Sequence, residues 1–128
     1  MEKYENEYVK IWIEQDVFHI VYLTEHYTEQ MIDHAIKIKF QVNSTEKWHP
    51  VFSDIRKAKS FTREARKRFA DKDSMDLTSA VAVLINSRIQ EVMFNFFKTI
   101  FKVPMPTKMF TDEKKAIAWL QQFNIRTE

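Results

Sequence analysis

The last third of the chain alternates between strand-like and helix-like segments, and this alternation limits the available folds more than any other feature. Residues 80–85 form an apolar run of strand length, and the polar residues 86–87 can cap a following helix. The pattern predicts a long amphipathic helix ending near Lys102, a short strand at 108–110 and a last helix over 111–123. Strand–helix–strand–helix is a repeat unit of the α/β folds.

The first half of the chain predicts a pair of strands, a helix and a further strand. Residues 8–13 and 17–23 are rich in β-forming residues and are separated by a polar turn, which is typical of a hairpin. Thr28 can cap a helix that ends near Asn43, and the next strand is expected at residues 51–55.

Together these segments predict a single α/β domain over residues 1–128. A helix over 63–72 and a loop over 71–74 complete the element order β-β-α-β-α-β-α-β-α. Because crossovers between parallel strands are right-handed, the strands from the third onward should be parallel, and the hairpin supplies an antiparallel edge. We therefore expect a mixed, mostly parallel sheet covered by helices, with residues 1–7 as a flexible tail or an edge strand.

The chain contains neither glycine nor cysteine. Without glycine, it has no P-loop, no dinucleotide-binding fingerprint and no nucleophile elbow. Without cysteine, it has no disulfide, no thiolate chemistry and no cysteine-based metal site. The four histidines fall on separate predicted elements without the paired spacing of a helical metal site, so no metal or other cofactor is expected.

No segment of the sequence has the pattern of a signal peptide or a membrane span. The N-terminus lacks a basic region followed by an apolar core, and the apolar run over 77–85 is only of strand length. We therefore expect a cytoplasmic protein.

A basic segment runs from Arg56 to Arg68, where seven of thirteen residues are basic and only Glu64 is acidic. Clustered lysines and arginines can bind nucleic-acid or phospholipid phosphates, but they can also form a solvated helix face. The aromatic residues of this region, Phe61 and Phe69, are expected to point inward, so no base-stacking platform forms and no nucleic-acid partner is expected.

Polar residues are expected where the parallel strands end, which is where open α/β sheets bind ligands. The candidates for binding a ligand or partner are Asp54, Asn86, Ser87 and Asp112. Ser87 and Asp112 have a simpler alternative role, because each can cap the helix that follows it. No serine has an evident base and orienting acid, so nucleophilic catalysis is not supported and the protein is not expected to be an enzyme.

The long helix is predicted to pack one apolar face on the sheet. Seven residues form this face: Ile89, Val92, Met93, Phe96, Phe97, Ile100 and Phe101. Phe94 lies off it among polar residues, so we expect Phe94 to be exposed and to contact a protein partner or a second copy of the chain. A homodimer is the expected assembly.

Two stretches carry a resemblance to a known family. One comprises residues 50–55 with 61–66, and the other comprises 95–97 with the pattern P-T-K-x-F-x-x-x-x-x-A-x-x-W-L over 106–120. The chain resembles the STAS domain, the fold of sulfate transporters and anti-sigma-factor antagonists, and more narrowly the SpoIIAA-like or STAS/SEC14-like small bacterial proteins. The likeness spans residues 8–123.

The resemblance implies a regulatory module that acts through protein contacts. In anti-sigma-factor antagonists a serine in an Asp-Ser-Ser/Thr-Gly turn is phosphorylated, but here Arg63 or Glu64 stands at that position and no glycine follows. The usual phosphoserine switch is therefore expected to be absent, although Ser60 and Thr62 are hydroxyl candidates nearby, and Thr62 can also cap a helix. The SEC14-like likeness implies an alternative, a carrier with a pocket for a small apolar or anionic ligand.

Overall fold

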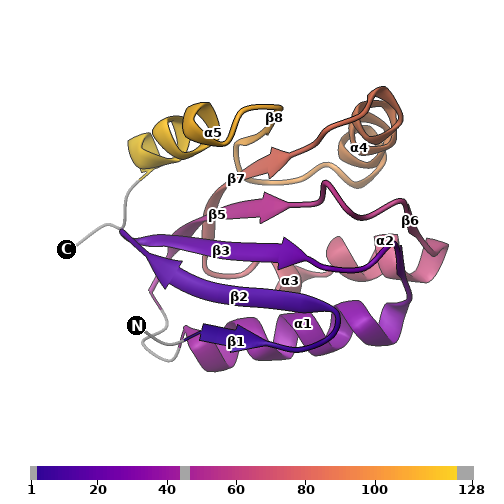
Figure 1. Cartoon of the computed structure of the whole chain (residues 1–128), viewed down its shortest axis with the longest axis horizontal. Helices are drawn as coiled ribbons and strands as arrows, with labels where there is room; N and C mark the ends of the chain where they lie inside the picture. Colours follow the sequence, from indigo (N-terminus) through magenta and orange to yellow (C-terminus); the bar gives the residue numbers. More distant parts are fainter. Residues whose placement is uncertain (1–2, 44–46, 124–128) are drawn as a thin grey trace.

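The structure, a computed structural model, describes residues 3–43 and 47–123, the side chain of Phe101 excepted (Figure 1). Within these residues, six strands form one sheet in the order β1-β2-β3-β5-β7-β8. Their bounds are β1 (Lys3–Glu5), β2 (Val9–Glu14), β3 (Val17–Tyr22), β5 (His49–Asp54), β7 (Thr78–Leu84) and β8 (Thr107–Phe110). Two further strands, β4 (His26–Tyr27) and β6 (Ser60–Phe61), pair with each other in parallel.

The helices connect the parallel strands and end the chain. They are α1 (Glu29–Val42), α2 (Arg63–Phe69), α3 (Lys72–Met75), α4 (Arg88–Phe101) and α5 (Glu113–Leu120), followed by a 3-10 turn, η1 (Gln121–Phe123). The β1–β2 and β2–β3 pairs are antiparallel, whereas the β3–β5, β5–β7 and β7–β8 pairs are parallel. The predicted mixed α/β sheet with an antiparallel N-terminal hairpin is confirmed, and residues 3–5 form its edge strand.

The structure differs from the predicted elements between β6 and β7. The helix expected over 63–72 ends at Phe69, and α3 replaces the expected loop. The Ser74 hydroxyl donates to the Phe69 carbonyl oxygen at 2.8 Å, while Arg68 donates to Asp71 and Asp73. These contacts fold the segment back as a second short helical turn, which no periodic pattern in four residues could indicate.

The sheet buries both of its faces, because successive residues of a strand point to opposite sides. On one face α5 packs against β5 and β7 (Figure 1). The residues of this cluster are Val17, Phe52, Ala80, Ala82, Leu84, Ala116 and Leu120. The alanines of β7 are fully buried, and their small side chains allow the helix to approach the strand closely.

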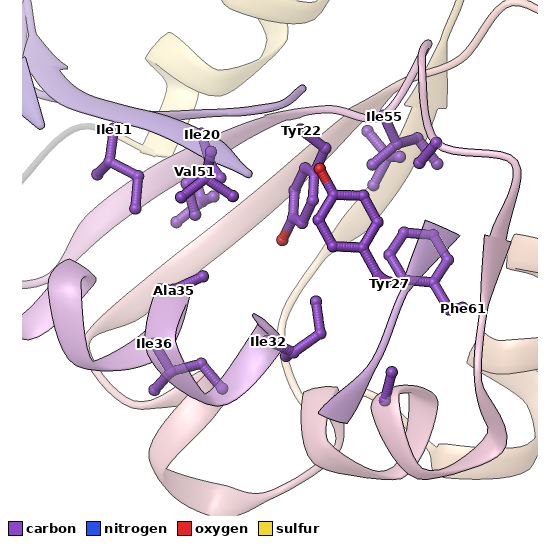
Figure 2. Packing of buried hydrophobic residues seen from close by; sticks show 14 of the residues in the cluster. Ile11, Ile20, Tyr22, Tyr27, Ile32, Ala35, Ile36, Val51, Ile55 and Phe61 are labelled. Atoms are coloured by element: carbon purple, nitrogen blue, oxygen red, sulfur yellow. The ribbon is translucent and has the colours of Figure 1, made fainter. Parts of the chain in front are cut away.

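Helices α1, α2 and α3 lie on the opposite face (Figure 1). Figure 2 shows Ile20 and Val51 of the sheet above Ile32 of α1, with the Tyr27 and Phe61 rings beside them. These two rings stack with centroids 5.3 Å apart. The β4–β6 pair that carries them thus closes one end of this core, which is the side where the cavity described below lies.

Four residues adopt left-handed backbone conformations that glycine would normally occupy. They are Gln15 and Asp16 in the β2–β3 turn, Leu77 before β7 and Lys102 at the end of α4, with φ between 49° and 66°. A left-handed conformation costs an ordinary residue roughly 1 kcal/mol. The chain therefore makes its tight turns without glycine at the expense of local strain.

Candidate ligand-binding pocket

An apolar cavity lies between the sheet and the helices on the α1 side. Its volume is about 180 Å³. Its lining comes from strands β3, β5, β6 and β7, helices α1, α2, α3 and α4, Ile55 after β5, and the segment 103–107, which ends at the first residue of β8. Ile20, Tyr22 and Val51 of the sheet lie opposite Ile32 of α1 across this space (Figure 2). Because side chains alternate along a strand, Ile20 and Tyr22 of β3, Val51 and Ser53 of β5, and Val81 and Val83 of β7 contribute to the same wall.

Most of the cavity lining is hydrocarbon. Its polar members, besides the phenol of Tyr22, are Lys39, Ser53, Arg66, Ser74, Thr78 and Thr107. The Tyr22 phenol is buried and hydrogen-bonded to Ser53, and burial raises its pKa far above the usual value, so it stays neutral. The cavity can therefore accept an apolar group and offers a few polar contacts at defined places.

Lys39 is a buried lysine in the wall of this cavity. Its ammonium group donates to the carbonyl oxygens of Ser74 and Asp76, at 3.1 and 3.4 Å, and to the Thr78 hydroxyl at 2.8 Å. Burial lowers the pKa of Lys39 to about 8, although the carboxylates of Asp76 and Asp73 partly oppose this effect. The amine is thus mostly charged at neutral pH. Its hydrogen bonds connect α1 to the start of β7.

Helix α4 is rotated relative to the orientation predicted from its sequence. Met93, Phe94 and Phe97 line the cavity, whereas Phe96 is 67% exposed. The inward side of the helix is turned by roughly 60° from the predicted apolar face, taking 100° per residue. The prediction that Phe94 points outward is therefore wrong, since Phe94 is partly buried against the core; an interface role for it stays a prediction.

The rotation of α4 leaves a strip of large apolar side chains at the surface. Its members are Ile89, Val92, Phe96 and Ile100, each more than half exposed. They recur at intervals of three and four residues and so share one side of the helix. We call these four residues the α4 strip.

Gln90 fixes the orientation of α4 and was not predicted from the sequence. Its side-chain amide nitrogen donates to the carbonyl oxygens of Ile55 and Ala58, at 2.9 and 2.8 Å. Its side-chain oxygen accepts from the Asn86 backbone amide at 3.0 Å. The buried Gln90 therefore links the loop after β5 to the turn after β7, and its polar side chain occupies the side of the helix that faces the core.

Of the polar candidates at the strand ends, Asp54 forms an ion pair, and Ser87 and Asp112 each cap the helix that follows. Asp54 is buried at the end of β5 and accepts a bidentate contact from the Arg56 guanidinium, at 3.0 and 2.8 Å. Ser87 accepts from the Gln90 amide as the N-cap of α4, and Asp112 accepts from the Lys114 amide as the N-cap of α5. The capping alternative is thus confirmed for Ser87 and Asp112.

The structure places Asp54, Asn86 and Asp112 along one edge of the sheet. Asp54 pairs with Leu84 of β7, whose own partner on β8 is Phe110, so each candidate follows or ends a neighbouring parallel strand. No hydrogen bond within the described residues joins these three side chains to one another. A ligand-binding role for Asp54, Asn86, Ser87 and Asp112 stays a prediction.

The two hydroxyl candidates near the expected switch have structural partners. Thr62 is the N-cap of α2 and accepts from the Ala65 amide at 3.1 Å, which confirms its predicted capping role. The Ser60 hydroxyl shares a hydrogen bond of 2.7 Å with Nδ1 of His26, across the β4–β6 pair. Both residues are exposed.

Several cations of the basic segment 56–68 are neutralised within the molecule. Arg56 pairs with Asp54, and Lys59 pairs with Glu25 at 3.1 Å. Arg68 forms ion pairs with three carboxylates among the described residues, those of Asp33, Asp71 and Asp73. The segment therefore presents less unpaired positive charge than its sequence indicates.

Among residues 3–43 and 47–123, no group of three or more histidine, aspartate and glutamate side chains is placed to hold a metal ion. No helix in these ranges is long and apolar enough to cross a membrane.

Comparison with solved structures places this architecture in a known fold class. The structure matches that of an uncharacterized protein from the DUF3478 family with a SpoIIAA-like fold, from Shewanella loihica PV-4, with a TM-score of 0.67. The match covers 88% of this chain and 91% of that chain at 16% sequence identity, so the likeness concerns the fold alone. The protein thus has a SpoIIAA-like α/β fold, as its sequence predicts.

The family follows from the sequence. The chain belongs to the family described as Domain of unknown function (DUF7793), whose model matches residues 11–124. A search of curated proteins gives no match. Because the matching family model is not a STAS model, the resemblance is confirmed for the SpoIIAA-like fold, whereas STAS-type regulation stays a prediction.

Proposed function

We propose that the protein is a non-enzymatic binding module that holds a small apolar ligand in the cavity beneath α4. The observation that carries this proposal is the cavity of about 180 Å³, lined mostly by hydrocarbon side chains. An apolar cavity of about 150 Å³ is already large enough to bind benzene. The volume suits a ring or a short chain rather than a long lipid tail.

The polar candidates at the strand ends already have structural partners, and this supports a binding role over catalysis. Asp54 is paired with Arg56, and both Ser87 and Asp112 cap helices. None of the three forms a hydrogen bond with a histidine of the described residues, and histidine is the residue that most often serves as a general base. A binding module needs only the cavity and the few polar groups in its wall.

The ligand proposal is tested with a variant that fills the cavity. Val81 of β7 lines the cavity, and Val81→Phe should occupy part of it. Val21 of β3 is a partly buried valine of the same sheet that does not line the cavity, so Val21→Phe is the matched control. Thermal unfolding is recorded for the three proteins with and without benzene.

A ligand that binds only the folded state raises the unfolding temperature. Benzene should therefore stabilise the wild type and Val21→Phe but not Val81→Phe. Native mass spectrometry of gently purified protein should also show an added mass that Val81→Phe lacks. A bare mass together with no benzene effect on the wild type would exclude the proposed function.

A second candidate function, contact with a protein partner or a second copy of the chain, is favoured by the α4 strip. Large apolar side chains grouped on one surface often mark an interaction site. Sedimentation of the wild type and Phe96→Asp tests the homodimer. A wild type that dimerises at micromolar concentration and a monomeric variant would support it, while a monomeric wild type at high micromolar concentration would contradict it.

A further inference from the structure

The charges in the cavity wall are of one sign. Among the described residues that line the cavity, Lys39 and Arg66 are cationic and none is acidic. A cation beside an apolar space is costly unless an opposite charge or hydrogen-bond acceptors compensate it. The wall therefore favours a ligand that brings negative charge.

Lys39 contributes positive charge to the cavity, but all three N–H donors of its ammonium group are already used. Its ammonium group donates to two carbonyl oxygens and to the Thr78 hydroxyl, so its three N–H bonds are occupied. No carboxylate of the described residues lies within ion-pair distance of its ammonium group. Lys39 thus supplies positive potential rather than a direct contact.

Arg66 differs from Arg56 and Arg68 in forming no ion pair with any of the described residues. Arg56 and Arg68 both form ion pairs with aspartates, whereas Arg66 donates one hydrogen bond within the described part of the chain, from Nη1 to the Phe61 carbonyl oxygen at 2.8 Å. Arg66 is partly buried, and most of its guanidinium donors remain available. A planar guanidinium matches a carboxylate with two parallel hydrogen bonds.

We propose that the ligand is a small amphipathic carboxylate whose hydrocarbon part fills the cavity and whose carboxylate is bound by Arg66. This inference rests on the proposed function, because it requires the cavity to be a ligand site. The volume of about 180 Å³ limits the hydrocarbon part to about the size of a benzene ring. Aromatic and short aliphatic carboxylic acids are the ligand class that fits both requirements.

The test compares a charged and a neutral ligand of similar shape. Phenylacetate and benzyl alcohol are titrated into the protein by calorimetry, alongside benzene. Because hydrogen bonds between charged groups are stronger than neutral ones, the wild type should bind phenylacetate about ten- to a hundredfold more tightly than benzyl alcohol. Arg66→Gln should remove this preference and leave benzene binding unchanged.

The matched control lies on the same helix. Arg63 is exposed and does not line the cavity, so Arg63→Gln should leave the binding of all three probes unchanged. If Arg66→Gln does not fold, Arg66→Lys keeps the charge without the planar fork and should retain only part of the preference.

The outcomes separate this inference from the proposed function. If benzene binds but phenylacetate binds no more tightly than benzyl alcohol, the carboxylate inference is overturned and the apolar site stands. The same holds if Arg66→Gln keeps the full preference. If none of the three probes binds, the proposed function fails, and the carboxylate inference fails with it.

Discussion

The ammonium group of Lys39, on α1, donates a hydrogen bond of 2.8 Å to the Thr78 hydroxyl at the start of β7. The sheet and its covering helix are thus joined by a charged side chain that is only 6% exposed. A buried amine with lowered pKa makes stability depend on pH. The direction of that dependence follows from the two protonation states.

The unfolding free energy should rise with pH between 8 and 10 through Lys39. Its pKa is about 8 in the folded protein and about 10.5 when unfolded, so over this range the unfolded chain binds more protons. Integrating that difference gives a gain of about 2 kcal/mol. Urea denaturation of the wild type and Lys39→Met, both over this pH range, measures it.

The comparison with Lys39→Met isolates the lysine. Other titrating groups, including buried Tyr22, affect both proteins alike. The gain with pH should therefore appear as a difference between the wild type and the variant. Parallel pH profiles for the two proteins would contradict the lowered pKa.

Removing the Gln90 side chain should destabilise the protein by about 3 kcal/mol. Gln90→Ala removes the side-chain donor to the carbonyl oxygen of the buried Ala58, whereas the Ile55 carbonyl oxygen keeps the Ala58 amide as a donor, and an unsatisfied buried polar group costs about 1–3 kcal/mol. Chemical denaturation measures the loss. Asn95→Ala is the control on the exposed side of the same helix, and it should change stability by no more than about 0.5 kcal/mol. Equal effects of both substitutions would exclude this role for Gln90.

The hydroxyls of Ser60 and Thr62 should differ in their contribution to stability. Thr62→Ala removes the N-cap of α2 and should cost about 1 kcal/mol, whereas Ser60→Ala changes an exposed contact and should cost about 0.5 kcal/mol or less. Denaturation of both variants measures this difference.

Neither hydroxyl is expected to act as a phosphorylation switch. Intact-mass analysis of the protein isolated from cells should therefore show no stoichiometric phosphate on Ser60 or Thr62. Finding such a modification on either residue would restore the regulatory switch that the altered turn argues against.

The order and direction of the main strands could be predicted because each leaves a local pattern in the sequence. The apolar run at 80–85 overlaps β7, and the alternating segments at 8–13 and 17–23 overlap β2 and β3. The paired strands β4 and β6 have only two residues each, too few for any alternation. Their pairing depends on contacts between distant segments.

The walls of the cavity could not be predicted from local patterns because they come from nine elements spread along the sequence. The sequence nevertheless contains one local indication of the cavity. Lys39 lies three residues after Ile36 and four after Ala35, so a charged residue falls on the apolar side of α1. Such a residue indicates a buried polar contact, but its partners near Thr78 become visible only in the fold.

The orientation of α4 was mispredicted because this helix is apolar around more than half of its circumference. The sheet covers only part of that surface, and the pattern of apolar residues does not say which part. Gln90 determines which side of the helix faces the core, because its hydrogen bonds hold its polar side chain there. A single buried polar residue therefore outweighs the apolar periodicity of the helix.

Two aspartate substitutions that should differ in how much stability they cost test this orientation of α4. Phe94 is partly buried and its ring packs against that of Phe97, with centroids 6.1 Å apart, whereas Phe96 is 67% exposed. Phe94→Asp loses apolar contacts and places a carboxylate against the core, so it should cost about 3 kcal/mol or more. Phe96→Asp should change stability by no more than about 0.5 kcal/mol, because it replaces an exposed side chain. Urea denaturation of the two variants gives both values. A larger loss for Phe96→Asp would mean that the helix faces the sheet as its sequence pattern predicted, and that the cavity beneath Phe94 and the exposed α4 strip are both misplaced.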